Sequence, residues 1–502
     1  MERRTWTIAV GAMMLWTVGA FLGGCGGSGS HAPVPVIQNI NSSTAPTSPV
    51  NLPIEINGSG FQAAPGKVVF TQGNITATVV PNASGWTDTG IIAVVPAGNG
   101  NTNFTLPGIV SVTVVTSGGT SNAINLNLIQ TLTFNPSLMS WTTTTPLAKA
   151  LTGLRAVAVP GSTSSTAFAI VTGGYDSAAS ANSNLTYSDN LNADGTVGSA
   201  TNVNWTTISA SSLPDTRAHH AMAEADPTNS LVAVTARVIY VIGGQKLSTD
   251  APGGTNTVFM ASVDPTAGTV GTWQALSSTL PQSLVGLSAT AYNGYLYVAG
   301  GLNTNGAPQS TVYSAPINAD GTLGSWTMSQ NPLPTATAFG SMFAFGGKLY
   351  FIDGDPNNST TPNNQGVGTT NVYFADIVRG VVGMWTQNPS LTIHDRAKGI
   401  LWSAFGQVIS GEGIYSGNAG GCPASGETEV STVHADGTLS SWNGLTGSNV
   451  PCANLYNGAA FVSPLISAAN TPRFLLLGGQ AFTGTTGPGG TVSSTVYVNS
   501  AP

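Results

Sequence analysis

The chain has 502 residues, of which only 7% are charged and 41% are hydrophobic, and its formal net charge is −7. Its 13 Lys and Arg residues are spread thinly, which excludes a nucleic-acid-binding protein because such proteins need clustered cations. Frequent apolar residues and sparse charge also exclude a largely disordered chain. The 63 Gly and 30 Pro residues favour short strands joined by many turns.

Residues 1–25 have the character of a targeting segment rather than of a folded element. Two arginines precede an apolar run over residues 5–22, and Leu22-Gly23-Gly24-Cys25 resembles the lipobox of bacterial lipoproteins. That resemblance implies a lipid anchor at Cys25 and an exported protein held at the outer membrane or cell surface. An ordinary signal peptide or a single membrane helix is the alternative. Residues 26–34 are expected to form a flexible tether.

Residues 35–130 are predicted to form a small β-sandwich, because short alternating strands recur between turn signals. Three phrases occur in order: Ile56-Asn57-Gly58-Ser59-Gly60-Phe61, then Trp86-Thr87-Asp88-Thr89 running on to Pro96, then Gly118-Gly119-Thr120-Ser121-Asn122. Together they resemble the immunoglobulin-like IPT/TIG domain. The resemblance implies a spacer or interaction module, here a stalk that lifts the next unit off the membrane.

A repeat organises residues 131–502. Six tryptophans mark it: Trp141, Trp205, Trp273, Trp326, Trp385 and Trp442. Most of them follow a phrase such as Asp320-Gly321, which predicts a hairpin turn because both residues accept a positive φ. Each unit also holds an apolar strand that ends in glycines, as in Tyr240-Val241-Ile242-Gly243-Gly244. The pattern indicates one small sheet per unit.

This strand order resembles the kelch repeat of β-propellers. Inner, glycine-ended and third strands occur six times, and the last third strand, at residues 495–498, has no Trp strand after it. The Trp141 strand, in turn, has no sheet of its own. The resemblance implies an all-β chain in which the sandwich is followed by a six-bladed propeller, closed by pairing of its N-terminal and C-terminal strands. Such closure removes exposed strand edges.

Cys422 and Cys452 are the only other cysteines. In an exported protein an isolated pair is most simply a disulfide. In the propeller topology both cysteines fall in loops on the same face, which supports the bridge.

The same topology places the long, varied loops on one face and the tight Asp-Gly turns on the other. Long polar loops on a rigid scaffold usually carry binding. The candidate residues begin the inner strands and rim the channel on the long-loop face: Arg155, Arg217, His219, His220, His394, Asp395 and Arg396. They favour a polar pocket for an anionic or sugar ligand. The alternative is that these arginines are structural and bind neighbouring backbone carbonyls.

These residues argue against three classes of enzyme site. Galactose-oxidase-like proteins combine both folds but hold copper with a Tyr crosslinked to Cys, and pairing of Cys422 with Cys452 argues against that site. Sialidases need three arginines, but the Asp-Gly turns here lack the sialidase spacing. His219 and His220 are adjacent, so they point to opposite sides of a strand and do not face one metal ion. No metal or other cofactor is expected.

The sequence therefore predicts a monomeric cell-envelope lipoprotein that binds a glycan or protein ligand at the long-loop face. A carbohydrate-active enzyme is the alternative, with its site at the channel mouth around Arg217, His220, His394 and Arg396. No nucleic-acid partner is expected.

Replacement of Cys25 by Ser removes the thiol that would carry the lipid. We expect the Cys25→Ser protein to move from the membrane fraction to the soluble fraction. Immunoblotting of salt-washed membranes measures this shift. A variant that still sediments with washed membranes would contradict the lipid anchor.

Overall fold

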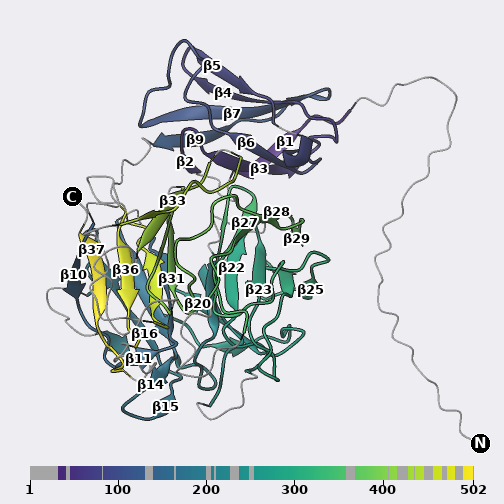
Figure 1. Cartoon of the computed structure of the whole chain (residues 1–502). Coiled ribbons are helices and arrows are strands. Elements are labelled where there is room, and N and C mark those ends of the chain that lie inside the picture. Colours follow the sequence, from purple (N-terminus) through teal and green to yellow (C-terminus); the bar gives the residue numbers. More distant parts are fainter. Residues whose placement is uncertain are drawn as a thin grey trace, which may run out of the picture.

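The computed structural model describes residues 32–40, 46–81, 83–129, 139–162, 165–198, 205–207, 211–225, 237–247, 254–357, 368–404, 406–414, 428–434, 436–445, 456–465, 472–480 and 490–500 (Figure 1). Within these ranges the regular elements are β-strands and one 3₁₀ turn, η1 (Ala83–Gly85), which confirms the all-β prediction. No helix there is long and apolar enough to cross a membrane. Cys25, Cys422 and Cys452 lie outside the described residues.

The N-terminal unit, residues 32–129, contains two sheets around one apolar core. One sheet has the order β1-β3-β6 and the other β2-β9-β7-β4-β5, with β8 paired to β7. All pairs are antiparallel except β2 with β9. The strands are β1 (Val36–Ile40), β2 (Thr47–Pro49), β3 (Pro53–Ser59), β4 (Lys67–Gln72), β5 (Ile75–Val79), β6 (Gly90–Val94), β7 (Gly108–Thr116), β8 (Gly119–Thr120) and β9 (Ile124–Ile129).

Two of the three phrases that resemble the IPT/TIG domain meet through hydrogen bonds around Trp86. The buried Trp86 indole donates to the carbonyls of Phe61 and Gln62 at 3.1 and 2.9 Å. The Asp88 carboxylate accepts a hydrogen bond from the backbone N–H of Gln62 at 2.8 Å. These bonds satisfy the backbone where β3 ends, which explains why Trp and Asp occur two residues apart in this segment.

The described residues of the C-terminal unit, between 139 and 500, form mainly six small antiparallel sheets. Sheets 1 to 3 are β12 (Arg155–Pro160), β13 (Ala167–Thr172), β16 (Thr186–Leu191), β17 (Thr206–Thr207); β18 (Ala221–Ala225), β19 (Arg237–Ile242), β20 (Val258–Val263), β21 (Gln274–Ala275); and β22 (Ser288–Tyr292), β23 (Tyr295–Ala299), β24 (Val312–Pro316), β25 (Thr327–Met328). Sheets 4 to 6 are β26 (Ser341–Phe345), β27 (Lys348–Ile352), β28 (Val372–Val378), β29 (Val381–Val382), β30 (Thr386–Gln387); β31 (Ile400–Ala404), β32 (Gln407–Gly411), β33 (Glu429–Thr432), β34 (Asn443–Gly444); and β35 (Ala459–Val462), β36 (Phe474–Leu477), β37 (Val496–Ser500), β10 (Ser140–Thr144). A small extra sheet joins β11 (Leu151–Thr152), β14 (Tyr175–Asp176) and β15 (Ala181–Asn182).

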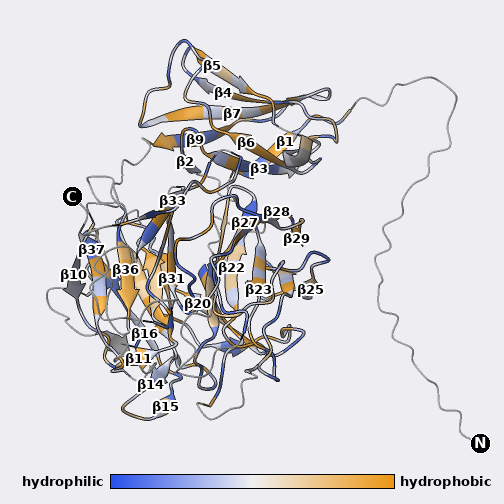
Figure 2. Cartoon of the chain, in the orientation of Figure 1, coloured by the Kyte–Doolittle hydropathy of each residue, from blue (hydrophilic) through white to orange (hydrophobic). Residues whose placement is uncertain are grey.

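Asp-Gly turns lead into the short outer strands. Asp194, Asp320 and Asp436 each accept the backbone N–H of a Thr two residues later at 2.9 Å. The glycine after each Asp has a positive φ, as this turn requires. Strands such as β31 and β36 are rich in hydrophobic residues, coloured orange in Figure 2. The predicted positions of the turns are therefore those observed.

Sheet 6 combines strands from the two ends of the C-terminal unit. Strand β10 pairs antiparallel with β37, with Trp141 opposite Asn499 and Thr143 opposite Tyr497. Strand β37 also pairs with β36. The Trp141 strand and the strand at residues 495–498 thus lie in the same sheet, as the repeat count predicted.

A continuous cycle of backbone hydrogen bonds links the six sheets just before their first strands. We call it the backbone ring, and its members are Gly153, His219, Gly286, Phe339, Lys398 and Asn457. Each amide donates to the carbonyl of the preceding member at 2.7–3.0 Å, and the Gly153 amide donates to Asn457. All six have φ between 53° and 67°. The left-handed backbone turns each amide toward its neighbouring sheet.

The glycine pairs that end the second strands explain a further set of contacts between sheets. The Gly244 amide donates to the carbonyl of Leu284, in the next sheet, at 2.8 Å. A side chain at Gly243 would place its Cβ 2.7 Å from the same oxygen. The Gly479 amide makes the equivalent bond to Leu151 in β11, the strand that precedes sheet 1 along the chain. The Gly-Gly signature therefore permits close approach of neighbouring sheets.

Gly286→Ala should destabilise the chain more than Gly73→Ala. Both glycines have a left-handed φ, which costs about 1–2 kcal/mol for other residues. A Cβ at Gly286 would also lie 2.6 Å from the Phe339 ring, whereas Gly73 has open space. Chemical denaturation of both variants measures the difference. Equal losses of unfolding free energy would show that Gly286 is not tightly packed against the Phe339 side chain.

Candidate functional site

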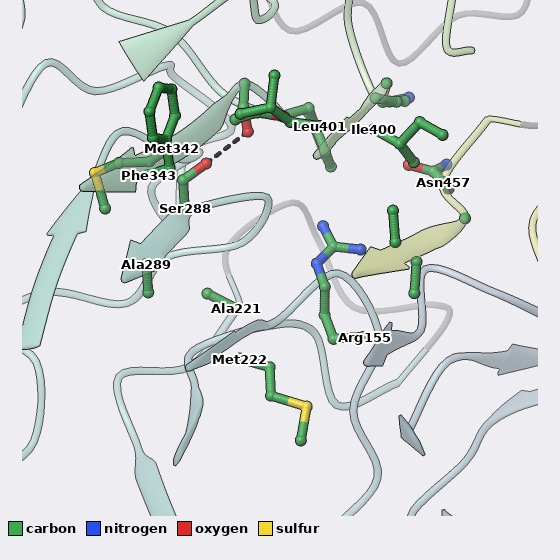
Figure 3. Close-up of a pocket in the computed structure, with 18 of the residues that line it drawn as sticks. Arg155, Ala221, Met222, Ser288, Ala289, Met342, Phe343, Ile400, Leu401 and Asn457 are labelled. Atoms are coloured by element: carbon green, nitrogen blue, oxygen red, sulfur yellow. Dashed lines mark hydrogen bonds between the residues drawn. The ribbon is translucent and has the colours of Figure 1, made fainter. Parts of the chain in front are cut away.

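The first strands of the six sheets surround a central cavity of about 210 Å³ (Figure 3). These strands contact one another in the order β12, β18, β22, β26, β31 and β35, and β35 contacts β12. Small residues from several sheets leave the space open: Ala156, Ala221, Ser288, Ala289, Gly340, Gly399 and Ala459. The volume is below the roughly 300–1,000 Å³ of pockets for drug-sized molecules, so it suits a ligand of monosaccharide size.

Two cations, Arg155 and Lys398, line this cavity, and no described lining residue is Asp or Glu. Figure 3 shows the Arg155 guanidinium pointing into the space between the strands, with Asn457 and Ser288 on its flanks. Arg155 donates one hydrogen bond to the Leu154 carbonyl at 2.8 Å, and no described carboxylate pairs with it. The cavity therefore has a positive potential that an anion would neutralise.

Burial lowers the pKa of both cations. It lowers the pKa of Arg155 to about 10. It also lowers the pKa of Lys398, and the negative charge of Asp355 opposes that shift. A partly desolvated cation with few partners gains strongly from a charge-assisted hydrogen bond to a bound anion.

Side chains of the backbone ring pack against one another beside these cations. The Lys398 ammonium lies 4.9 Å from the centroid of the Phe339 ring. The His219 ring meets Phe339 edge-on, with centroids 5.7 Å apart. Burial, followed by the charges of Lys398 and Arg155, lowers the pKa of His219 to about 3, so this imidazole is neutral. The contact with Phe339 holds the lysine in place through a cation–π interaction.

Arg217 lies away from the cavity and is fully buried between sheets. Its guanidinium forms an ion pair with Asp215, donates to the Thr216 carbonyl at 2.9 Å and lies 4.8 Å from the Phe259 ring centroid. These contacts are those of a structural arginine, the alternative interpretation of the sequence.

Arg396 is also buried, and its main partner is Glu429 at the start of β33. The guanidinium donates to Glu429 Oε1 at 3.1 Å and to the Glu412 carbonyl at 2.8 Å. Glu429 further accepts the backbone amides of Ile393 and His394 at 2.5 and 3.1 Å. Burial raises the pKa of Glu429, but the hydrogen bond from His394 and the charge of Arg396 outweigh it and hold the pKa below its usual value. This carboxylate fixes the loop that enters sheet 5.

The remaining predicted site residues occupy separate places. His220 is buried, its Nε2 lies 2.9 Å from the Thr172 hydroxyl, and burial holds its pKa well below the usual value. His394 has 20% of its side chain exposed, and its Nδ1 lies 3.2 Å from Glu429. Asp395 is half-buried next to it. Among the predicted residues, only Arg155 lines the central cavity.

Four residues that line the cavity were not predicted from the sequence: Ser288, Phe339, Lys398 and Asn457. Lys398, Phe339 and Asn457 occupy the same position of their repeats, immediately before an inner strand, so aligning the repeats on that position could have found them. In the described part of the chain, no cluster of three or more His, Cys, Asp or Glu residues could hold a metal ion.

Arg396→Met should lower the unfolding free energy by about 3–5 kcal/mol, because it leaves the Glu429 carboxylate buried without its cation. Chemical denaturation measures the loss. Lys246→Met is the matched control, since Lys246 pairs with Asp215 at 2.9 Å but is 46% exposed, and it should change the unfolding free energy by less than about 1 kcal/mol. Equal effects of both variants would contradict the structural role of Arg396.

Comparison with known proteins identifies no family. No protein-family model matches the chain, and no curated protein matches it. Among solved structures the chain is similar to one described as the structure of YjhT, with a TM-score of 0.46 and 15% sequence identity. The match covers 70% of this chain and 95% of that one. At this level of similarity the comparison carries no argument about function.

Proposed function

We propose that this chain is a cell-envelope lipoprotein whose C-terminal unit binds a small anionic glycan, such as a sugar acid, in its central cavity. The observation that carries the proposal is the pair of cations, Arg155 and Lys398, in a cavity whose described lining has no carboxylate. The protein is again a binding protein, but its site lies in the central cavity and not in the long loops.

Several features support a kelch-like six-bladed propeller as the fold of the C-terminal unit. Its six sheets follow one another along the chain, their first strands are in contact in a cyclic order, and β10 pairs with β37. The IPT/TIG resemblance of the N-terminal unit agrees with its two sheets and single core.

The position of the N-terminal unit supports access to the cavity from the opposite end. Strand β3 lies against the turn between β22 and β23, whereas the β14–β15 loop lies at the far end of the C-terminal unit (Figure 1). Arg155 and Lys398 lie at or just before the starts of β12 and β31, at that far end. An anchor at Cys25 would attach through the N-terminal unit, so the cations would face away from the membrane.

The enzyme alternative was placed around Arg217, His220, His394 and Arg396, and its best support is the 3.2 Å separation between His394 Nδ1 and Glu429 Oε1. A carboxylate beside a histidine is the usual arrangement of a general base. Here, however, the Glu429 carboxylate is already occupied by Arg396 and by two backbone amides. Neither residue lines the central cavity. The pair is better explained by its structural role, which favours binding over catalysis.

Replacement of Arg155 by Met should weaken binding of a hexuronic acid by about 10- to 100-fold, since a hydrogen bond to a charged group contributes about 1.5–3 kcal/mol. Isothermal titration calorimetry on the mature protein measures the affinity, with the corresponding neutral hexose as the ligand control. Lys67→Met, which removes an exposed cation of β4, should leave the affinity unchanged. Equal binding of the acid and the neutral sugar, or full affinity in Arg155→Met, would overturn the proposal.

A further inference from the structure

Three side chains of the backbone ring each lie against the preceding member of the ring. A Cβ at Gly153 would lie 2.7 Å from the His219 imidazole, and a Cβ at Gly286 would lie 2.6 Å from the Phe339 ring. The Lys398 ammonium lies over that same phenyl ring, 4.9 Å from its centroid. Glycine at positions 153 and 286 therefore leaves the space that the imidazole and the phenyl ring occupy.

These side chains meet at the end of the central cavity where the first strands begin. His219 precedes sheet 2 and Phe339 precedes sheet 4, yet the centroids of their rings are only 5.7 Å apart, so they reach across Gly286 of sheet 3. Phe339, Lys398 and Asn457 also line the cavity. We call the side chains of His219, Phe339 and Lys398 the plug.

The backbone ring leaves only a narrow opening for the plug to fill. A backbone hydrogen bond holds two chains about 4.8 Å apart, so six such bonds enclose an opening with a radius of about 5 Å from its centre to the Cα atoms. The backbone atoms themselves take up part of that radius. A phenyl ring, an imidazole and a lysine side chain fill most of the remainder, so the plug closes the long-loop end of the cavity.

The N-terminal unit packs on turns at the opposite end of the cavity. A Cβ at Gly346, between β26 and β27, would lie 2.5 Å from the Pro53 ring. The Asn293 side chain, between β22 and β23, donates a hydrogen bond to the buried carboxyl group of Glu55. The two cations of the cavity lie at the other end, next to the plug. A second sugar residue attached to an anion bound there would therefore extend through the backbone ring.

We propose that Phe339 sets the size limit of the ligand, so that the cavity binds a single sugar acid and excludes its oligosaccharides. This inference rests on the proposed function, in which Arg155 and Lys398 bind the carboxylate beside the ring. A single sugar residue enters when Phe339 turns aside, and the plug closes again behind it. Two linked residues keep the plug displaced, which removes the cation–π contact with Lys398 and the edge-on contact with His219.

Phe339→Gly tests the size limit, because glycine accepts the left-handed φ of 55° at this position and removes the phenyl ring. The wild-type chain should bind a hexuronic acid at least about tenfold more tightly than the corresponding 1,4-linked disaccharide acid, because the second sugar ring clashes with the plug. Phe339→Gly should bind the two acids about equally. Isothermal titration calorimetry on the mature protein measures both affinities.

Arg379→Gly is the matched control. Arg379 also has a left-handed φ, of 47°, but it lies in the exposed turn before β29 and does not line the cavity. This variant should keep the wild-type preference for the single sugar acid. Equal or tighter binding of the disaccharide acid by the wild-type chain would overturn the size limit, and so would an unchanged preference in Phe339→Gly.

Acetylation of Lys398 by sulfosuccinimidyl acetate tests the plug without any sugar. Its rate relative to that of the exposed Lys67, measured by peptide mass spectrometry, should rise several-fold in Phe339→Gly but not in Arg379→Gly. It should also rise in His219→Gly, which suits the positive φ, leaves the cation–π contact in place and carries the test if Phe339→Gly does not fold.

The two measurements separate this inference from the proposed function. A wild-type chain that binds neither acid would contradict the proposed function, and the size limit with it. Binding of both acids with equal affinity would leave the proposed function standing and overturn only the size limit. An unchanged acetylation rate of Lys398 in both glycine variants would show that the plug does not close the cavity.

Discussion

The architecture of the C-terminal unit depends on the backbone ring of six hydrogen bonds. Each sheet buries one face against the next, but side-chain packing alone does not fix how far each sheet is rotated about the centre. A backbone donor and acceptor at the same position of every sheet supply that constraint. His219, Phe339 and Lys398 adopt left-handed conformations to make it, a strain that the surrounding packing offsets. Two of them, Phe339 and Lys398, bring an aromatic and a cationic side chain to the central cavity.

The position of an arginine relative to this ring decides whether it is structural or faces the cavity. Arg155 follows the ring member Gly153 by two residues and enters the cavity. Arg217 and Arg396 precede their ring members, His219 and Lys398, by two residues and lie buried between sheets. An arginine two residues after the ring member thus faces the cavity, where it can bind an anion. An arginine two residues before the ring member is buried and stabilises a loop.

The sequence was sufficient for much of the fold because its signals are local. Asp320-Gly321 turns and glycine pairs such as Gly243-Gly244 each have one dominant conformational reason to exist, and they occur where expected. The site was harder to predict, because three arginines begin or precede first strands in similar sequence contexts: Arg155, Arg217 and Arg396. Only their position relative to the backbone ring distinguishes them, and the sequence does not show that position. Lys398 and Phe339 gave no warning of a left-handed backbone, since neither is Gly or Asn. The burial of Glu55 depends on contact between two units, which no local pattern encodes.

The pairing of β10 with β37 has a consequence for how the protein is made. Sheet 6 needs strands from both ends of the C-terminal unit, so β10 lacks its partner and β36 keeps an open edge until the last strand has left the ribosome. Unpaired edges attract other chains, and long-range pairing is slow to form. An incomplete chain would therefore pass through a period in which association with chaperones competes with aggregation. The order of synthesis, rather than final stability, then limits the yield of folded protein.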